Sequence, residues 1–127
     1  MELLSTTKTY AAIGPYSQAV KVNGLLYSSG QIPLTNEGEI VANDLKLQTR
    51  QIFKNIKALL EDNGSSMDEV IKLNIFLTDI NDFGIVNVLM AEAFGDHKPV
   101  RTTMAVNALP KNSLIQMDVM ASLCDFH

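Results

Sequence analysis

The sequence predicts an α+β fold in which two helices lie on one face of a mixed sheet of about six strands, a common sheet size. Apolar and polar residues alternate over 70–79 and 114–123, which is typical of half-buried strands. Over 44–63 the apolar spacing changes to that of an amphipathic helix, and it does so again after residue 82. The 127 residues contain no linker or low-complexity segment, so we expect a single domain, 1–127.

Two turns are predicted before the first helix. In "YSQAVKVNGLLYSSG" two apolar arms flank Asn23-Gly24, and both residues accept the positive φ angles of a type I′ turn. This pattern predicts a β-hairpin. In "IPLTNEGEIV" a second turn is expected at Glu37-Gly38.

The first helix is predicted from an apolar stripe at helical spacing, with Lys, Arg, Gln and Glu on the opposite face. Asn43 or Asp44 can cap its beginning, and Asn63-Gly64 is typical of a left-handed C-terminal cap. The stripe consists of Leu45, Ile52, Phe53, Ile56, Leu59 and Leu60.

A short helical turn and a strand are expected next. "SMDE" at 66–69 has the Ser-x-x-Glu spacing of a capping box. The strand "VIKLNIFLTD" is expected to bury one face and to leave a mixed face on the other side. The buried face is predicted to contain Ile71, Leu73, Ile75 and Leu77.

A second helix is expected to begin at a cap on Asn81 or Asp82 and to end before a loop over 95–99. Two strands, over 101–109 and 114–123, are expected to close the chain. The apolar face of the helix is predicted to contain Phe83, Val86, Met90 and Phe94.

Two helices can cover only one side of such a sheet, so its other side needs a partner. That side is too apolar to remain in water, which predicts burial against another copy of the chain. Its predicted apolar residues are Phe76, Met104, Leu114 and Met120.

The composition excludes several classes of function. The net charge is −4 and no basic stripe is present, which argues against nucleic-acid binding. No apolar run approaches the roughly 20 residues of a membrane span, and the N-terminus does not resemble a signal peptide. The single cysteine, Cys124, fits a reducing compartment, so we expect a cytoplasmic protein.

The familiar catalytic motifs are missing. His97 and His127 are far apart and indicate no metal site, and no base is evident that could activate a serine or Cys124. The sequence contains no G-x-S-x-G, P-loop or G-x-G-x-x-G motif. An enzyme with this sequence would therefore work without a metal, a cofactor or a covalent nucleophile.

Arg101, in "PVRTTMAVNALP", opens what we expect to be a buried strand. Two interpretations of this charge are open. It can be a strand-end arginine that lies in solvent, or it can bind an anionic ligand.

Five segments occur together and in order: "AIGPYSQAV", "SSGQIP", "LLEDNG", "DINDF" and "RTTMAVNALP". With them the chain resembles, over nearly its full length, the reactive intermediate deaminase (Rid, formerly YjgF) family. The resemblance implies a chorismate-mutase-like α+β fold and a homotrimer whose sheets form a central barrel. It also implies cofactor-free clefts between subunits, in which enamines and imines such as 2-aminoacrylate are hydrolysed to 2-oxo acids and ammonia.

The resemblance also implies roles for individual residues. Arg101 falls on the residue that binds the substrate carboxylate, which suits a planar guanidinium that keeps its charge. Tyr16 falls on the tyrosine that closes over the ligand, although ordinary packing after a turn is the alternative. The other positions that match the family's site are Ser29, Gly30, Asn87 and Thr103, the last of which is cysteine in many relatives.

The chain departs from the family pattern in two places. Gln116 stands where the family has a glutamate that helps to hold the attacking water, and Asp118 lies one step further along the strand. Glutamine can orient a water through its carbonyl oxygen but cannot serve as a base. The loop "GDHKPV" is also shorter than is usual.

Two other functions therefore remain open. One is a trimer that binds 2-oxo acids or similar carboxylates with little catalysis, which the change at Gln116 favours. The other is action on RNA or inhibition of translation, a role of some family members, against which the acidic composition argues.

Overall fold

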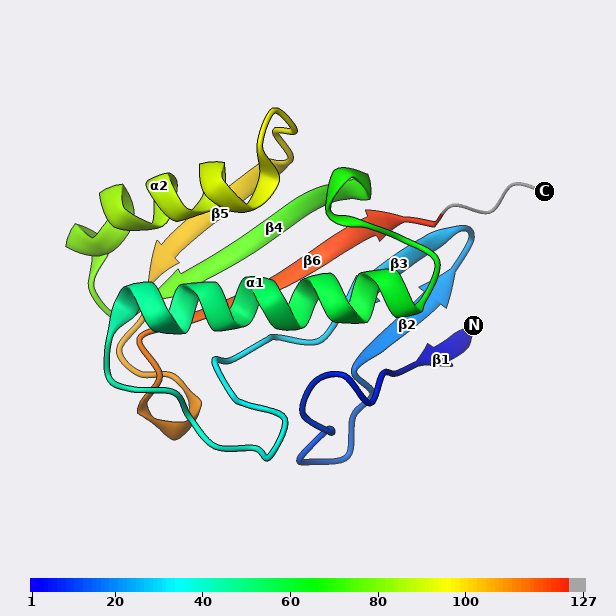
Figure 1. Ribbon diagram of the computed structural model, residues 1–127, viewed down its shortest axis with the longest axis horizontal. Helices are drawn as coiled ribbons and strands as arrows, with labels where there is room; N and C mark the ends of the chain where they lie inside the picture. Colours follow the sequence, from blue (N-terminus) through cyan, green and yellow to red (C-terminus); the bar gives the residue numbers. More distant parts are fainter. Residues whose placement is uncertain (124–127) are drawn as a thin grey trace.

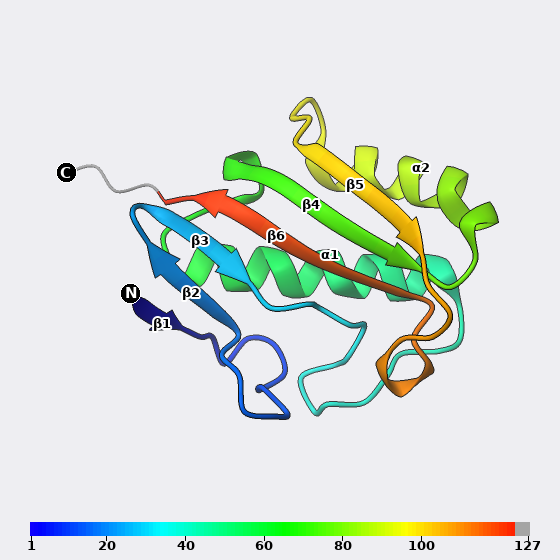
Figure 2. The same ribbon diagram turned by 180° about the vertical axis from the view of Figure 1, so that it is seen from behind.

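The computed structural model describes residues 1–123 and places them in two layers, a mixed six-stranded sheet and two helices (Figure 1). The strand order is β1-β2-β3-β6-β4-β5, and every neighbouring pair is antiparallel except β4–β5. Seen from behind, in Figure 2, the sheet carries no helix on its second face. The predicted α+β architecture is confirmed. The predictions for Cys124 and His127 lie outside the described residues.

The elements follow in the order strand, hairpin, helix, strand, helix, strand, strand. The strands are β1 (Glu2–Leu4), β2 (Ala19–Val22), β3 (Leu25–Ser28), β4 (Val70–Leu77), β5 (Val100–Ala105) and β6 (Ile115–Ser122). The helices are α1 (Leu45–Asp62) and α2 (Phe83–Phe94), with the 3-10 turns η1 (Met67–Glu69), η2 (Ile80–Asp82) and η3 (Pro110–Asn112).

The turns and the first helix form as predicted. Asn23 and Gly24 have φ angles of 53° and 76° and connect β2 to β3. The Asp44 side chain accepts a hydrogen bond from the Leu47 N–H at 3.0 Å, and Gly64, just beyond the helix, has a φ of 82°. The second turn is closed by the Gly38 N–H, which donates to the Thr35 carbonyl. Local sequence signals are sufficient for these elements.

The buried face of β4 differs from the prediction at Ile71. A β-bulge between Val70 and Lys72 shifts the pairing with β6, so Val70 is buried and Ile71 is 40% exposed. Leu73, Ile75 and Leu77 are buried as predicted. The bulge adds one residue at the start of the strand and turns Ile71 away from the helices.

The capping box at 66–69 does not form. Ser66 makes no side-chain capping bond, and the carboxylate of Glu69 accepts a hydrogen bond from the Ser122 hydroxyl instead. The second helix likewise lacks a side-chain cap, because Asp82 makes no such bond. Asp79 accepts the Asn81 N–H and so supports the preceding 3-10 turn. The short turn predicted at 66–69 does form, as η1, without the side-chain bonds of a capping box.

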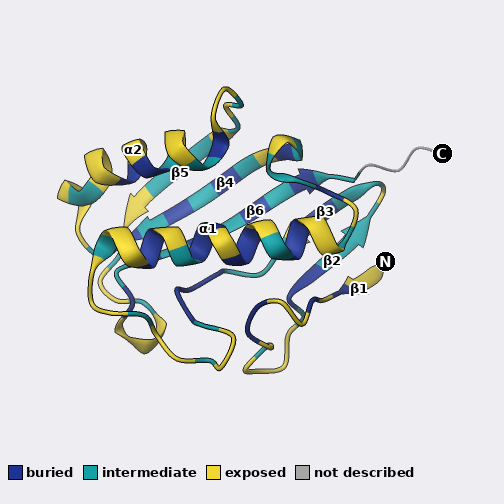
Figure 3. Ribbon diagram, in the orientation of Figure 1, coloured by how far each residue is buried: buried dark blue, intermediate teal, exposed yellow. Residues whose placement is uncertain are grey.

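The apolar face of α2 is also rotated from the predicted one. Val86 and Phe94 are buried, but Leu89 takes the place expected for Phe83, which is 36% exposed. Met90 packs against the core from its edge. Leu89 is buried between α1 and α2, where it lines the same hollow as Phe53. Figure 3 shows that the buried side of α2 faces α1 and the sheet.

The strand β5 is shorter and more exposed than predicted. It ends at Ala105 rather than at 109, because its partner β4 ends at Leu77, whose carbonyl accepts one last bond from the Val106 N–H. It is an edge strand rather than a buried one, with Val100 61% and Met104 46% exposed.

The face of the sheet without helices is uncovered, as expected. Phe76, Leu114 and Met120 are only half-buried there, beside the exposed Met104. Neither helix of the described chain combines the length and the apolar character that crossing a membrane requires.

Candidate functional site

Arg101 lies near the start of β5, opposite Leu73 of β4 in the parallel pairing. Because paired residues of neighbouring strands point to the same side, Arg101 lies on the face of the sheet that carries the helices. It is half-buried against α2. The side chain is therefore neither in the core nor free in solvent.

Three residues of α2 contact the guanidinium of Arg101: Phe83, Asn87 and Met90, whose sulfur lies 3.6 Å from Nη1. Nη1 donates to Oδ1 of Asn87 at 2.5 Å, and Cζ lies 4.7 Å from the centre of the Phe83 ring, in cation–π geometry. Within residues 1–123 the guanidinium makes no ion pair with a carboxylate. Its positive charge is thus oriented by neutral groups and is available to an anion.

Thr103 lies two residues further along β5 and on the same side as Arg101. Its Oγ1 is buried and has no hydrogen-bond partner. An unpartnered buried hydroxyl is uncommon in proteins. The hydrogen-bonding capacity of the Thr103 hydroxyl, beside Arg101, is therefore unused among the described residues.

Tyr16 lies on a loop at a different part of the sheet. Its N–H donates to the Gly14 carbonyl at 2.8 Å, and its hydroxyl accepts the Ile13 N–H at 3.3 Å, so the ring closes over its own turn. The side chain is 45% exposed. Ser29 anchors this loop, because its hydroxyl donates to the Ser17 carbonyl at 2.5 Å.

Gly30 and Gln116 are in direct contact. A Cβ atom at Gly30 would lie 2.5 Å from Nε2 of Gln116, so the glutamine side chain occupies the space that any other residue would fill. The nearby Gln31 exchanges two backbone hydrogen bonds with Met117, at 2.6 and 3.0 Å, and so fixes this segment against β6. Gly30 is needed here for close approach rather than for a special φ angle.

The predicted site residues thus form two groups. The first group, on α2 and β5, comprises Arg101, Asn87 and Thr103. The second group, beside the start of β6, comprises Tyr16, Ser29, Gly30 and Gln116. Gln116 pairs with Phe76 of β4 and lies on the face without helices, opposite to the face of Arg101. Within one chain the two groups do not meet around one ligand.

One residue of each group, Asn87 and Tyr16, lines a hollow. One, of about 230 Å³, is lined by Asn87 and the loop over 95–99. The other, of about 540 Å³, is lined by Tyr16, Ser17 and the N-terminal segment. A third hollow, of about 610 Å³, lies between the two helices and contains none of the predicted residues.

Two supporting residues were not evident in the sequence. Phe83 is one turn before Asn87, and this spacing of four residues in "DFGIVN" is the signal that could have revealed a shared helix face. Tyr10 belongs to a small second core and its hydroxyl accepts the Ile32 N–H at 3.1 Å. Burial raises the pKa of the Tyr10 phenol, which keeps the hydroxyl neutral beneath the segment that carries Ser29.

The chemistry available is that of charge and hydrogen bonding. Among residues 1–123 there is no cluster of three His, Cys, Asp or Glu side chains that could hold a metal ion. The first group offers a fixed cation, and the second offers a tyrosine, a serine hydroxyl and an amide. This combination can bind a small carboxylate and orient a water molecule.

Comparison with known proteins identifies the family. The family whose model matches residues 6–123 is described as Endoribonuclease L-PSP, and YyfA of Yersinia pestis, a structure from the conserved Rid family, is 44% identical. The chain belongs to the YjgF/Rid family. YyfA superposes with a TM-score of 0.93 and covers 96% of this chain and 98% of its own. The predicted resemblance and fold are confirmed.

Other relatives also match more than nine tenths of this chain. A RutC family protein of Pyrococcus abyssi is 46% identical over 121 residues, 94% of this chain and 95% of its own. The chloroplastic Reactive Intermediate Deaminase A of Arabidopsis thaliana is 41% identical over 96% of this chain and 66% of its own. The structure of E. coli TdcF with bound serine has a TM-score of 0.90 at 34% identity, covering 96% of this chain and 98% of its own.

Proposed function

We propose that this Rid-family protein hydrolyses small 2-imino acids and their enamine tautomers to 2-oxo acids and ammonia. The observation that carries the proposal is the guanidinium of Arg101, which is half-buried, oriented by Asn87 and Phe83, and without a carboxylate partner within residues 1–123. A charged hydrogen bond from such a group contributes about 1.5–3 kcal/mol. That is enough to select a carboxylate and to fix its orientation.

In the proposed reaction Arg101 binds the carboxylate while Tyr16 and Ser29 order the rest of the ligand. Protonation of the enamine carbon gives the iminium ion, and water adds to its C=N bond. A proton then passes from the added water to the nitrogen, which gives the N-protonated carbinolamine. Collapse of the carbinolamine breaks the C–N bond and releases ammonia and the 2-oxo acid. Gln116 orients the water through its carbonyl oxygen, which accepts a hydrogen bond but does not remove the proton.

The proposed site is completed by a second copy of the chain. Arg101 and Gln116 lie on opposite faces of the sheet, and the face without helices carries apolar side chains among polar ones and is uncovered within one chain. A homotrimer in which β5 of one subunit approaches the loop over 14–30 of the next would bring both groups to one cleft. For the reaction itself, support comes from the relative named Reactive Intermediate Deaminase A and from TdcF, whose bound serine is an amino acid with a carboxylate.

The test uses 2-aminoacrylate, made in place by a serine dehydratase, and semicarbazide as a trap for the surviving imine. The wild type is expected to divert imine from the trap, and Arg101→Ala to lose this effect. Arg101→Lys keeps the charge but loses the planar fork, so we expect intermediate activity. An Arg101→Ala variant as active as the wild type would overturn the proposal.

A second function is favoured by one observation, the amide at Gln116 in place of a carboxylate. In this alternative the trimer binds 2-oxo acids and catalyses little. An inert wild type and an active Gln116→Glu variant would identify it, provided that 2-oxobutanoate still binds to the wild type. Cleavage of RNA, which the family description names, would appear as degradation of single-stranded RNA by the wild type.

A further inference from the structure

The face of the sheet without helices, seen in Figure 2, carries one cation and one anion on its strands. They are Lys72 of β4 and Asp118 of β6, which alternate with the buried Leu73 and Val119 and therefore point away from the helices. The other charged residues of the six strands are in register with buried core residues and lie on the helix side. These are Glu2, Lys21 and Arg101.

Lys72 has no hydrogen-bond acceptor directly opposite it on either neighbouring strand. Its partners in the sheet are Met120 of β6 and Val100 of β5, and both are apolar. Lys72 is half-buried between these strands, and its ammonium group forms no ion pair within residues 1–123. It is therefore a cation flanked by apolar side chains.

Asp118 is held by a neutral group. Asn74 lies directly opposite on β4, and its Nδ2 donates to Oδ1 of Asp118 at 2.8 Å. Lys72 is two residues before Asn74, so it is only a diagonal neighbour of Asp118. Within residues 1–123 the second carboxylate oxygen, Oδ2, accepts no hydrogen bond. This oxygen is available to a cation that approaches from outside the chain.

Burial of this face against other copies of the chain would remove both charges from water. An unpaired charge in an interface destabilises it strongly, whereas a well-placed opposite charge offsets the loss of hydration. Around a threefold axis each subunit meets its two neighbours with different parts of its surface. Each subunit can then supply a cation to one neighbour and an anion to the other, and the uncovered face carries one of each.

We propose that Lys72 of one subunit forms an ion pair with Asp118 of the next, and that three such pairs fix how the sheets pack together. The inference rests on the homotrimer of the proposed function. Apolar contacts alone allow two sheet faces to slide past one another, because they have no preferred direction. A charge pair fixes one register. A pair within one chain is less favoured, because Asn74 already holds the carboxylate opposite itself.

The first experiment removes the two charges separately and together, and follows the oligomer by sedimentation over a dilution series. Asp118→Asn keeps an acceptor for Asn74 but leaves Lys72 buried without a partner. The concentration at which half of the trimer dissociates should rise about a hundredfold. Lys72→Met/Asp118→Asn removes both charges and should recover most of this loss.

The second experiment reverses the charges and asks whether the pair joins two chains. Lys72→Glu and Asp118→Lys should each assemble poorly alone, and a mixture of the two should assemble again, because each chain brings the charge that its neighbour lacks. Mixing cannot restore a pair within one chain, since each chain then keeps two like charges.

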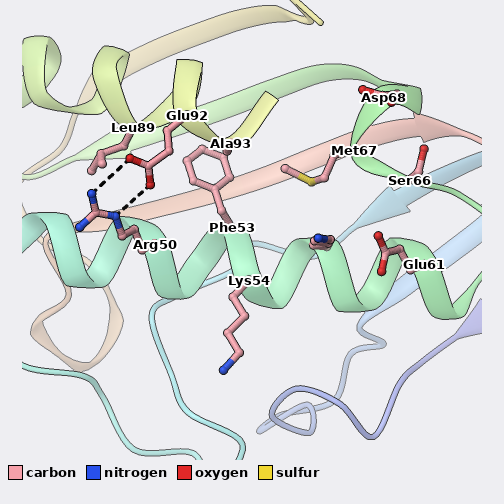
Figure 4. A pocket seen from close by; sticks show the side chains of 11 residues that line it. Arg50, Phe53, Lys54, Glu61, Ser66, Met67, Asp68, Leu89, Glu92 and Ala93 are labelled. Atoms are coloured by element: carbon pink, nitrogen blue, oxygen red, sulfur yellow. Dashed lines mark hydrogen bonds and ion pairs between the residues drawn. The ribbon is translucent and has the colours of Figure 1, made fainter. Parts of the chain in front are cut away.

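The matched control for the mixture is Lys57→Glu with Glu61→Lys. These residues are one turn apart on α1 and line the hollow between the helices, on the other side of the sheet (Figure 4). The changes in charge are the same as in the second experiment. Each control variant should form trimers alone, and mixing should have no effect.

The possible results separate this inference from the proposed function. Asp118→Asn trimers as stable as those of the wild type would overturn the ion pair, and so would charge-reversed chains that stay apart when mixed. If the wild type is then still trimeric and diverts imine in the trapping assay, the proposed function remains. A wild type that is monomeric at every concentration would overturn the pair together with the shared cleft.

Discussion

The guanidinium of Arg101 lies over the ring of Phe83, with Cζ 4.7 Å from the ring centre, while Asn87 holds the same group from the next turn of α2. The edge strand and the helix are thereby joined at the charge that we assign to the substrate carboxylate. Phe83 is 36% exposed and contributes little to the core, so its contact with Arg101 accounts for its position. Phe83 is accordingly a positioning residue for Arg101.

Phe83→Leu should raise the KM for the imine about two- to fivefold, because a cation–π contact at a partly exposed site contributes about 0.5–1 kcal/mol. kcat should change little, since the same contact is present before and during the reaction. Phe83→Tyr keeps the ring and should retain the wild-type KM. Steady-state kinetics in the semicarbazide assay separate the two constants, and equal KM values for Leu and Phe at this position would contradict the assigned role.

Gly30→Ala should lower activity without loss of stability. The added Cβ would lie 2.5 Å from Nε2 of Gln116, and the flexible end of the glutamine can move away at small cost to the fold. The water held by Gln116 would then be misplaced, so kcat should fall while the thermal midpoint stays within a few degrees. Gly84→Ala is the matched control, since a Cβ there meets no atom within 4 Å. A Gly30→Ala variant with wild-type kcat would show that Gln116 is not needed in its present place.

Local patterns predicted the elements whose determinants are close in sequence. The Asn23-Gly24 turn and the Asp44 cap each depend on residues within one turn, and both form as expected. The alternation along β6 is also seen in its burial, with every second residue from Ile115 buried. These features need no knowledge of the partner strands.

The errors occur where the position of a residue depends on distant parts of the chain. Ile71 is turned outward by a bulge that exists only in the pairing of β4 with β6, and β5 ends where β4 ends. The strand β1 consists of only three residues and has no alternating pattern long enough to be recognised. Its pairing with β2 is fixed by the tertiary fold.

In the candidate site, too, some features follow from neighbouring residues and others from distant parts of the chain. Arg101 and Gln116 could be selected from motifs, but the face on which each lies follows from the order of strands in the sheet. The strand–helix–strand order of β4, α2 and β5 favours a parallel pairing, but no local pattern places β5 at the edge. The separation of the two groups within one chain could therefore be found only in the structure.

A shared cleft predicts recovery of activity in mixed oligomers. Arg101→Ala and Gly30→Leu each disable one of the two groups, and each variant alone should be inactive. In trimers that contain both chains, one site in three would combine two intact groups, so about a third of the wild-type activity should return. The two chains are co-expressed with different tags, and doubly tagged oligomers are isolated and assayed. Full inactivity of these hybrids would place both groups of one site in the same chain.

The loss of stability at acid pH, measured as the free energy of unfolding, should depend on Asp62. The Thr6 hydroxyl and the Lys8 ammonium, the latter at 2.9 Å, hold the pKa of the Asp62 carboxyl below its ordinary value of 3.8. A lowered pKa in the folded state stabilises the protein above pH 3.8, and this contribution is lost as the pH falls through the folded-state value. Asp62→Asn should therefore lower stability at neutral pH and flatten the curve at acid pH. Urea unfolding across this range tests it, and an Asp62→Asn curve as steep as that of the wild type would contradict this role.

Thr103→Val should stabilise the protein, because it replaces a buried hydroxyl without a partner by a methyl group of similar volume. The relief of an unsatisfied buried polar group is about 1–3 kcal/mol, and valine also suits a strand. Thr49→Val is the matched control, since the buried Thr49 hydroxyl donates to the Leu45 carbonyl at 2.7 Å, and its loss should lower stability.

Because Oγ1 of Thr103 is buried, kcat/KM for the imine should be unchanged. Urea denaturation measures the first effect and the trapping assay the second. A stabilised variant with reduced kcat/KM would identify this hydroxyl as a direct contact of the ligand beside Arg101.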